Sequence, residues 1–165
     1  MQGKGAALVR RGRNGRNRPV HCLHQPLGQV KAQTHSAPVG GVIAAVKKLA
    51  GDDPKAQLVA FFDVLDRWFN APDFRGCQFI NAAAEFPNPH DPVHAVAAEH
   101  KRKTRELFRD LAQAAGASDA ETFADQYTAL VEGTLILRQV HGRNDAAQVI
   151  KPAVEALVAD ALGSP

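Results

Sequence analysis

The sequence predicts an all-α fold, a helical bundle of about six helices, on three observations. From Val42 onward, apolar residues recur three and four positions apart, and no stretch shows the strict alternation of a half-buried strand. Capping residues or prolines precede several of these stretches, and glycines follow most of them. The 165 residues, 45% of them hydrophobic, also suffice for one domain with a sizeable core.

Residues 1–41 have a different composition from the remainder of the chain. They contain 7 of the 20 basic residues and no Asp or Glu, which leaves 13 basic against 17 acidic residues in 42–165. They show no helical or strand period, and such a segment cannot bury enough apolar surface to offset the entropy of ordering. We therefore expect a basic, disordered or aberrant N-terminal segment at 1–41 and a helical domain at 42–163.

The first two helices are predicted from their ends. Val42 to about Leu49 has helical spacing, and Gly51 supplies a C-terminal stop. The next helix begins at Asp53-Pro54, because proline suits the first helical turn. Its apolar face carries Leu58, Phe61, Phe62, Leu65, Trp68 and Phe69.

The third and fourth helices lie on either side of a proline-rich break. A short apolar helix is predicted around 77–86, ended by Pro87-Asn88-Pro89. Asp91-Pro92 then opens a long helix that runs to about Ala115, with Gly116 beyond its end. A basic cluster at 101–105 is interpreted as a solvated helix face paired with nearby glutamates.

The last two helices are also predicted from capping residues. Ser118 and Glu121 form a capping box that opens a helix through about Val140. Asn144 is predicted to cap the final helix, which Pro152 should kink or delay.

The segment Arg75-Gly76-Cys77…Phe79-Ile80-Asn81-Ala82-Ala83-Ala84-Glu85-Phe86 resembles the ligand-binding and dimerisation domain of TetR-family transcriptional regulators. The order and lengths of the helices over roughly 42–163 are similar to that domain as well. The resemblance implies the regulatory, ligand-sensing and dimerising domain of such a regulator. It also implies that a small apolar ligand enters the bundle, with no cofactor.

A ligand site between helices should be mostly apolar with a few polar groups. Asn81 and Glu85 share a helix face, and a buried carboxylate needs a partner, which could be a ligand, Arg75 or an arginine on another helix. The aromatic and aliphatic candidates could equally be plain core. The predicted pocket residues are Phe62, Trp68, Cys77, Ile80, Asn81, Ala84, Glu85, Phe108 and Tyr127.

A homodimer interface is expected on the last two long helices. They are apolar beyond the needs of one inner face, and in the family this pair forms a two-fold four-helix bundle with its partner. The alternative is that both helices cover the core of a monomer. The predicted interface residues are Leu130, Gly133, Thr134, Leu137, Val154, Leu157 and Val158.

The family resemblance also implies an N-terminal helix-turn-helix that binds DNA, and no such motif is recognisable in residues 1–41. A lost motif and an out-of-frame reading or wrong start both remain open. We expect no sequence-specific operator binding by this chain. The alternative function is a basic-tailed helical protein that binds nucleic acid through phosphate contacts without sequence specificity.

Other classes of function find little support in the sequence. No nucleophile triad order, phosphate-binding glycine loop or paired catalytic carboxylates are visible, so we predict no enzyme and no cofactor. His90 and His94, like His21-Cys22-Leu23-His24, lack the further ligands of a metal site. Two distant cysteines indicate free thiols in the cytoplasm. No apolar run approaches the roughly 20 residues of a membrane span.

Overall fold

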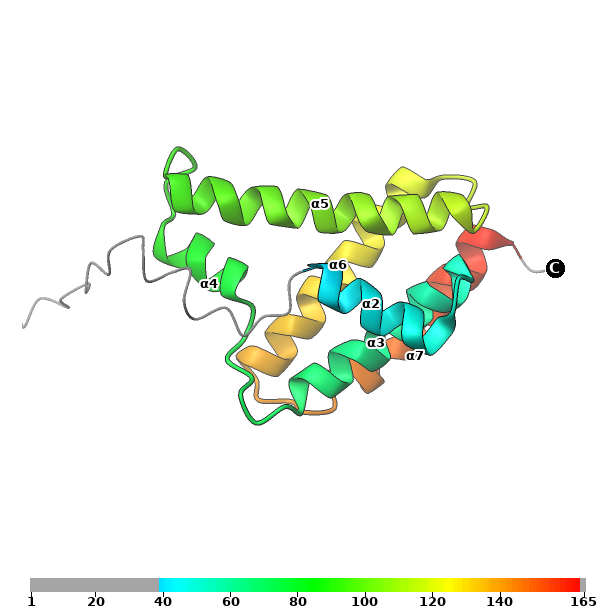
Figure 1. The fold of residues 1–165 in the computed structure, drawn as a ribbon, viewed down its shortest axis with the longest axis horizontal. Coiled ribbons are helices and arrows are strands. Elements are labelled where there is room, and N and C mark those ends of the chain that lie inside the picture. The colour runs from blue at the N-terminus through cyan, green and yellow to red at the C-terminus, as the bar shows by residue number, and fades with distance from the viewer. Residues whose placement is uncertain (1–38, 164–165) are drawn as a thin grey trace, which may run out of the picture. The chain divides into compact units, whose positions relative to one another are not determined.

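The computed structural model describes residues 39–163, which form one compact unit of six α-helices without strands (Figure 1). The predicted all-α fold is thereby confirmed. The helices are α2 (Val39–Ala50), α3 (Pro54–Phe69), α4 (Gln78–Glu85), α5 (Pro92–Ala114), α6 (Ala120–Gln139) and α7 (Ala146–Leu162). Helix α2 begins three residues before the predicted domain boundary, and residues 1–38 of the predicted N-terminal segment lie outside the described part. Among the described helices, none is long and apolar enough to cross a membrane.

Two of the predicted helix starts are confirmed in detail. The carboxylate of Asp53 accepts a hydrogen bond from the backbone N–H of Lys55 at 3.0 Å, ahead of Pro54 in the first turn. Asp91 accepts from the N–H of Val93 at 2.8 Å in the same way. Each carboxylate satisfies a backbone donor that the helix itself leaves unpaired.

Two other caps differ from the prediction by one residue. Asp119, not Ser118, caps α6 and accepts from the N–H of Thr122 at 3.0 Å. A carboxylate is a stronger acceptor than a hydroxyl and also favours the positive end of the helix dipole. Asp145 precedes α7 in place of Asn144 and makes no capping bond through its side chain. Helix α7 runs without a break past Pro152, whose ring is exposed.

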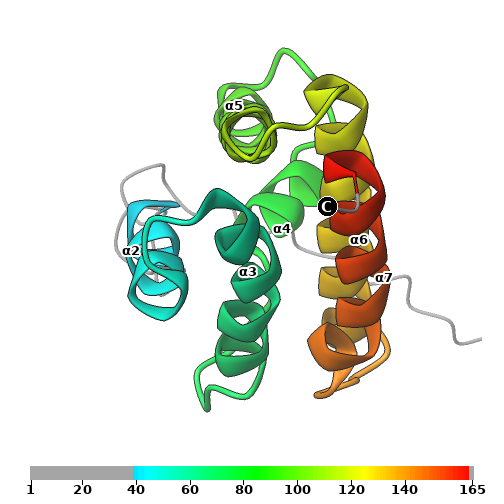
Figure 2. The same ribbon diagram turned by 90° about the vertical axis from the view of Figure 1, so that its right-hand side faces the viewer.

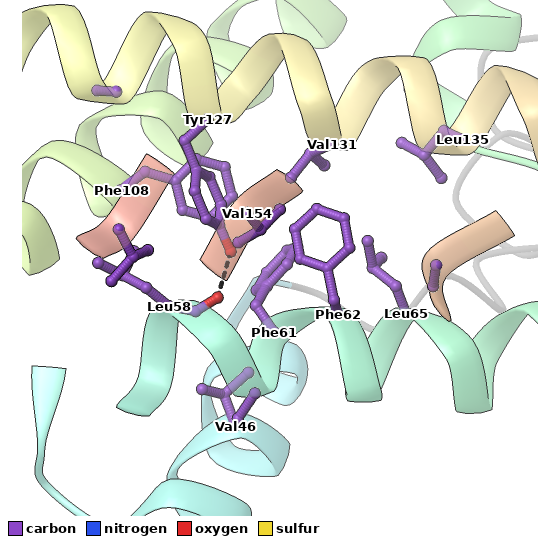
Figure 3. Close-up of a cluster of buried hydrophobic side chains, with 14 of the residues drawn as sticks. Val46, Leu58, Phe61, Phe62, Leu65, Phe108, Tyr127, Val131, Leu135 and Val154 are labelled. Atoms are coloured by element: carbon purple, nitrogen blue, oxygen red, sulfur yellow. Dashed lines mark hydrogen bonds between the residues drawn. The ribbon is translucent and has the colours of Figure 1, made fainter. Parts of the chain in front are cut away.

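Helices α3 and α5 each pack against three others, α3 against α2, α5 and α7, and α5 against α3, α4 and α6. Helix α6 packs between α5 and α7, and α4 rests on α5 (Figure 2). Figure 3 shows the core where α3, α5 and α6 meet around Tyr127. The Tyr127 ring is fully buried, and its hydroxyl donates to the carbonyl of Leu58 at 2.6 Å. Burial raises the pKa of Tyr127 well above its usual value.

Candidate functional site

A cavity of about 230 Å³ opens between five of the six helices. We call it the central cavity. Helices α2, α3 and α4 contribute mainly apolar side chains, and most of the polar groups come from α5 and α6. Its lining consists of Gly41, Val42, Ala45, Phe61, Val64, Leu65, Trp68, Phe79, His100, Lys101, Thr104, Leu107, Val131, Glu132 and Leu135.

Four polar side chains on α5 and α6 form what we call the polar edge of the central cavity: His100, Lys101, Thr104 and Glu132. The ammonium group of Lys101 donates to the Glu132 carboxylate at 2.7 Å, and both side chains are about 30% exposed. The Thr104 hydroxyl donates to the carbonyl of His100 at 2.9 Å, so its lone pairs stay available as acceptors. The polar edge therefore carries one paired positive and negative charge beside groups that can still form hydrogen bonds.

His100, in the polar edge, has one ring nitrogen without a hydrogen-bond partner in the described part of the chain. Its Nδ1 is buried and has no hydrogen-bond partner among residues 39–163. Burial lowers the pKa of His100, the positive charges of Lys101 and Lys103 lower it further, and Glu132 opposes them. The ring also meets Phe79 of α4 edge to face. These effects together favour the uncharged form of the imidazole.

The structure brings only one of the predicted pocket residues, Trp68, to the central cavity. Phe62, Phe108 and Tyr127 are at most 1% exposed and pack into the aromatic core beside it. The other five belong to α4 or precede it. Cys77 is buried at the N-cap of α4 and Ile80 is half-buried, whereas the remaining three are exposed: Asn81, Ala84 and Glu85.

The interior positions expected for Asn81 and Glu85 are wrong, because α4 presents them to its outer side. Asn81 accepts a hydrogen bond from the side-chain amide of Gln139, near the end of α6. The same Gln139 accepts from the backbone N–H of Cys77 at 3.1 Å. Arg75, the expected partner of Glu85, instead donates to the carbonyls of Pro72 and Phe74. Asn81 thus anchors α4 to α6.

The predicted interface residues divide between the interior and the surface. Thr134, Val154 and Val158 are at most 1% exposed in the single chain and therefore face its own core. Leu130, Leu137 and Leu157 are half-buried, and Gly133 is exposed. Further exposed small and apolar residues lie on α6, at its C-cap and on α7. We call this set the α6–α7 face: Ala129, Gly133, Ile136, Val140, Val149, Ala153 and Ala156.

Sequence reasoning missed most of the cavity lining, although the spacing in α5 holds a signal for it. His100, Thr104 and Leu107 follow Ala97 at intervals of three and four, so Thr104 lies on the buried stripe. Part of the basic cluster at 101–105 was also misinterpreted. Its Lys101 bonds to Glu132, and its Arg105 bonds to Glu121 and Asp125, all on α6. A lysine in a run of charged residues can therefore line a cavity when its Cα lies beside the apolar stripe of the helix.

No three His, Cys, Asp or Glu side chains within residues 39–163 are grouped so that they could hold a metal ion. The chemistry available in the central cavity is binding through apolar contact and a few hydrogen bonds.

Comparison with known proteins relates both the sequence and the fold of the chain to one family. The sequence profile described as "Tetracyclin repressor-like, C-terminal domain" matches residues 54–154. The fold is similar to the crystal structure of SCO4454, a TetR-family transcriptional regulator from Streptomyces coelicolor. That likeness has a TM-score of 0.67 and 24% identity, and it covers 75% of this chain and 67% of that one.

A second similar crystal structure is described as a TetR transcriptional regulator, sav143, from Streptomyces avermitilis. It gives a TM-score of 0.61 and 21% identity, over 81% of this chain and 79% of that one. Both likenesses show the fold. The search of curated proteins returned no significant match.

Proposed function

The chain belongs to the tetracyclin repressor-like C-terminal domain family, and we propose that it senses a small ligand in its central cavity and acts as a homodimer. The family match makes the described helices the regulatory domain of a TetR-like transcriptional regulator. It places the chain among regulators rather than enzymes, as predicted, and favours this function over the basic-tailed nucleic-acid-binding alternative.

The observation that carries the ligand-sensing proposal is the central cavity itself. A well-packed bundle leaves few voids larger than a water molecule, whereas about 230 Å³ is more than the roughly 150 Å³ of an engineered cavity that holds benzene. The lining combines aromatic side chains from α3 and α4 with hydrogen-bonding groups from α5 and α6, which is the usual character of a small-molecule site.

Helix α2 connects this cavity to the N-terminal part of the chain. Gly41, Val42 and Ala45 line the cavity, and α2 follows residues 1–38 directly in sequence. A ligand in the cavity would touch α2, so its affinity depends on where α2 lies. By linkage, the ligand then favours one position of α2 over another.

The α6–α7 face supports the homodimer part of the proposal. The exposed fractions of Ile136, Val140 and Val149 are 38%, 68% and 48%, and these side chains lie on neighbouring helices. Exposed apolar residues that gather on two packed helices mark an association surface more often than scattered ones do. Ala129, Gly133 and Ala153 are small enough for close approach of a second pair of helices.

Trp68 provides the test of ligand entry, because it is the only tryptophan of the chain and it lines the cavity. A neutral heavy-atom quencher, bromobenzene, should reduce Trp68 fluorescence in a saturable manner in the full chain. Ala45→Phe, which places a ring in the cavity, should remove the saturable quenching. Ala44→Phe is the matched control, since Ala44 is exposed on the same helix. Equal quenching in both variants would sink the ligand-sensing proposal.

We expect no specific operator binding by this chain, because residues 1–41 carry no recognisable helix-turn-helix. Sequence-specific and salt-resistant binding in a gel-shift assay would refute this expectation. A role in transcription implies a place in the cytoplasm.

A further inference from the structure

We propose that the central cavity takes an uncharged, hydroxyl-bearing ligand of about nine non-hydrogen atoms, most of them apolar, and that the polar edge selects this class. The inference rests on the proposed ligand-sensing function and names the chemistry of that site.

The size follows from the volume of the cavity. Benzene, with six carbon atoms, occupies an engineered apolar cavity of roughly 150 Å³. By the same scale, about 230 Å³ accommodates one substituted aromatic ring or an aliphatic chain of similar bulk. Trp68 and Phe61 of α3 and Phe79 of α4 supply an apolar side against which such a body packs.

The Lys101–Glu132 ion pair is the reason why we expect the ligand to be uncharged. The two side chains face each other at 2.7 Å on adjacent helices, so the charge of Lys101 is already compensated. A ligand carboxylate would gain little from Lys101 and would lie near the Glu132 carboxylate. A ligand ammonium would meet Lys101 itself. Either ion would also lose hydration on entering a mostly apolar cavity.

We expect the ligand to carry a hydroxyl because the polar edge keeps both a donor and an acceptor that can bond to it. The Lys101 ammonium group has three donors and uses one of them on Glu132. Thr104 keeps acceptor capacity, because its hydroxyl only donates, to the carbonyl of His100. A hydroxyl both donates and accepts, so it can engage a donor and an acceptor of the polar edge at once. Its polar group would then face α5 and α6, with the apolar body toward α3 and α4.

Four probes with nearly the same skeleton test this inference in the full chain. They are 2-phenylethanol, phenylacetate, 2-phenylethylamine in its ammonium form, and ethylbenzene as the apolar reference. Trp68 fluorescence reports binding of each. We expect 2-phenylethanol to bind at least about tenfold more tightly than phenylacetate or the ammonium probe, since an unpaired charge in the cavity costs more than about 1.4 kcal/mol. Equal or tighter binding of either ion would overturn the inference.

Glu132→Gln gives a second and independent readout. The substitution frees the charge of Lys101 and should shift the preference toward phenylacetate, so that the alcohol-to-carboxylate affinity ratio falls about tenfold. Glu99→Gln is the matched control, because Glu99 pairs with Arg102 on the exposed side of α5 and does not line the cavity. An unchanged ratio in Glu132→Gln would contradict the assigned role of the charge pair.

The outcomes separate this inference from the function on which it rests. If bromobenzene enters the cavity and is excluded by Ala45→Phe, but the four probes fail to bind or rank otherwise, only the ligand class is wrong. If bromobenzene does not enter, the ligand-sensing function fails and this inference fails with it.

Discussion

We expect His100 to make the folding stability of this domain depend on pH. Burial lowers its pKa in the folded chain below the ordinary value of about 6.5, with Lys101 and Lys103 acting in the same direction against Glu132. The unfolded chain therefore binds this proton more readily than the folded one. The stability that neutral His100 contributes is present above about pH 6.5 and is lost as the pH falls toward the folded-state pKa.

Replacement of His100 by glutamine should remove this part of the pH dependence. We expect the melting temperature of the unmodified chain to drop more between about pH 7.5 and pH 5.5 than that of His100→Gln. His141→Gln serves as the control, because His141 is exposed in the turn after α6. Parallel melting profiles for the chain and His100→Gln would show that His100 is not the titrating group.

Buried apolar residues were easier to predict from the sequence than polar residues that face inward. Phe62, Phe108 and Tyr127 were expected inside and are inside. Lys101 was assigned to a solvated face, yet it turns toward Glu132 on another helix. The position of a long polar side chain depends on a partner 31 residues away, which the spacing within one helix does not contain.

Among the elements, α4 depends most on a distant contact. Gly76, just before α4, has a φ of +83°, and a Cβ there would overlap the side-chain amide of Gln139 on α6. Arg138, the neighbour of Gln139, donates to the carbonyl of Phe69 at 2.9 Å and lies 4.5 Å above the centre of the Phe74 ring. The last turn of α6 thus holds the loop that leads into α4, which in turn supplies Phe79 to the cavity.

Substitution of Gly76 measures how much its contact with Gln139 contributes to the stability of the domain. Gly76→Ala should lower the free energy of unfolding by about 1 to 3 kcal/mol from backbone strain, plus about 1 kcal/mol for displacing Gln139 from Cys77 and Asn81. Gly116→Ala is the control, because Gly116 has a φ of +90° with open space around it. Chemical denaturation should show the larger loss in Gly76→Ala; equal losses would argue against the anchor.

Helix ends were predictable from the sequence because their causes are local. Asp53, Asp91 and the glycines that follow α2, α5, α6 and α7 act within a few residues of the end that they define. The outer position of Asn81 was not predictable, since it depends on Gln139, 58 residues further along the chain.

For the whole molecule, the α6–α7 face is our proposed surface for a second chain, on two helices that lie side by side (Figure 2). Both helices are apolar on more than one side, so three of the interface residues predicted from the sequence, Thr134, Val154 and Val158, lie in the chain's own core instead. Val154 and Val158 point into the core, and the smaller Ala153 and Ala156 are exposed next to them. A homodimer formed here would be two-fold, with the same residues contributed by each copy.

Gly133→Arg tests this face without disturbing the chain that carries it. A Cβ at Gly133 meets nothing within 4 Å, so the single chain accommodates a side chain there. We expect helical content and melting of the isolated chain to be retained, and sedimentation equilibrium to give the mass of one chain, 17.7 kDa, rather than twice that mass. Val96→Arg, on the exposed side of α5, should stay dimeric. A Gly133→Arg chain that remains dimeric would mean that another surface pairs.

Occupation of the central cavity by a small ligand can be seen directly through the bromine anomalous signal from crystals of the full chain grown with 2-(4-bromophenyl)ethanol. We expect one bromine peak inside the cavity, near Trp68 and Phe61, with density for the hydroxyl toward Thr104 and Lys101. A cavity without bromine, in crystals that show the peak only on the outer surface, would contradict this expectation.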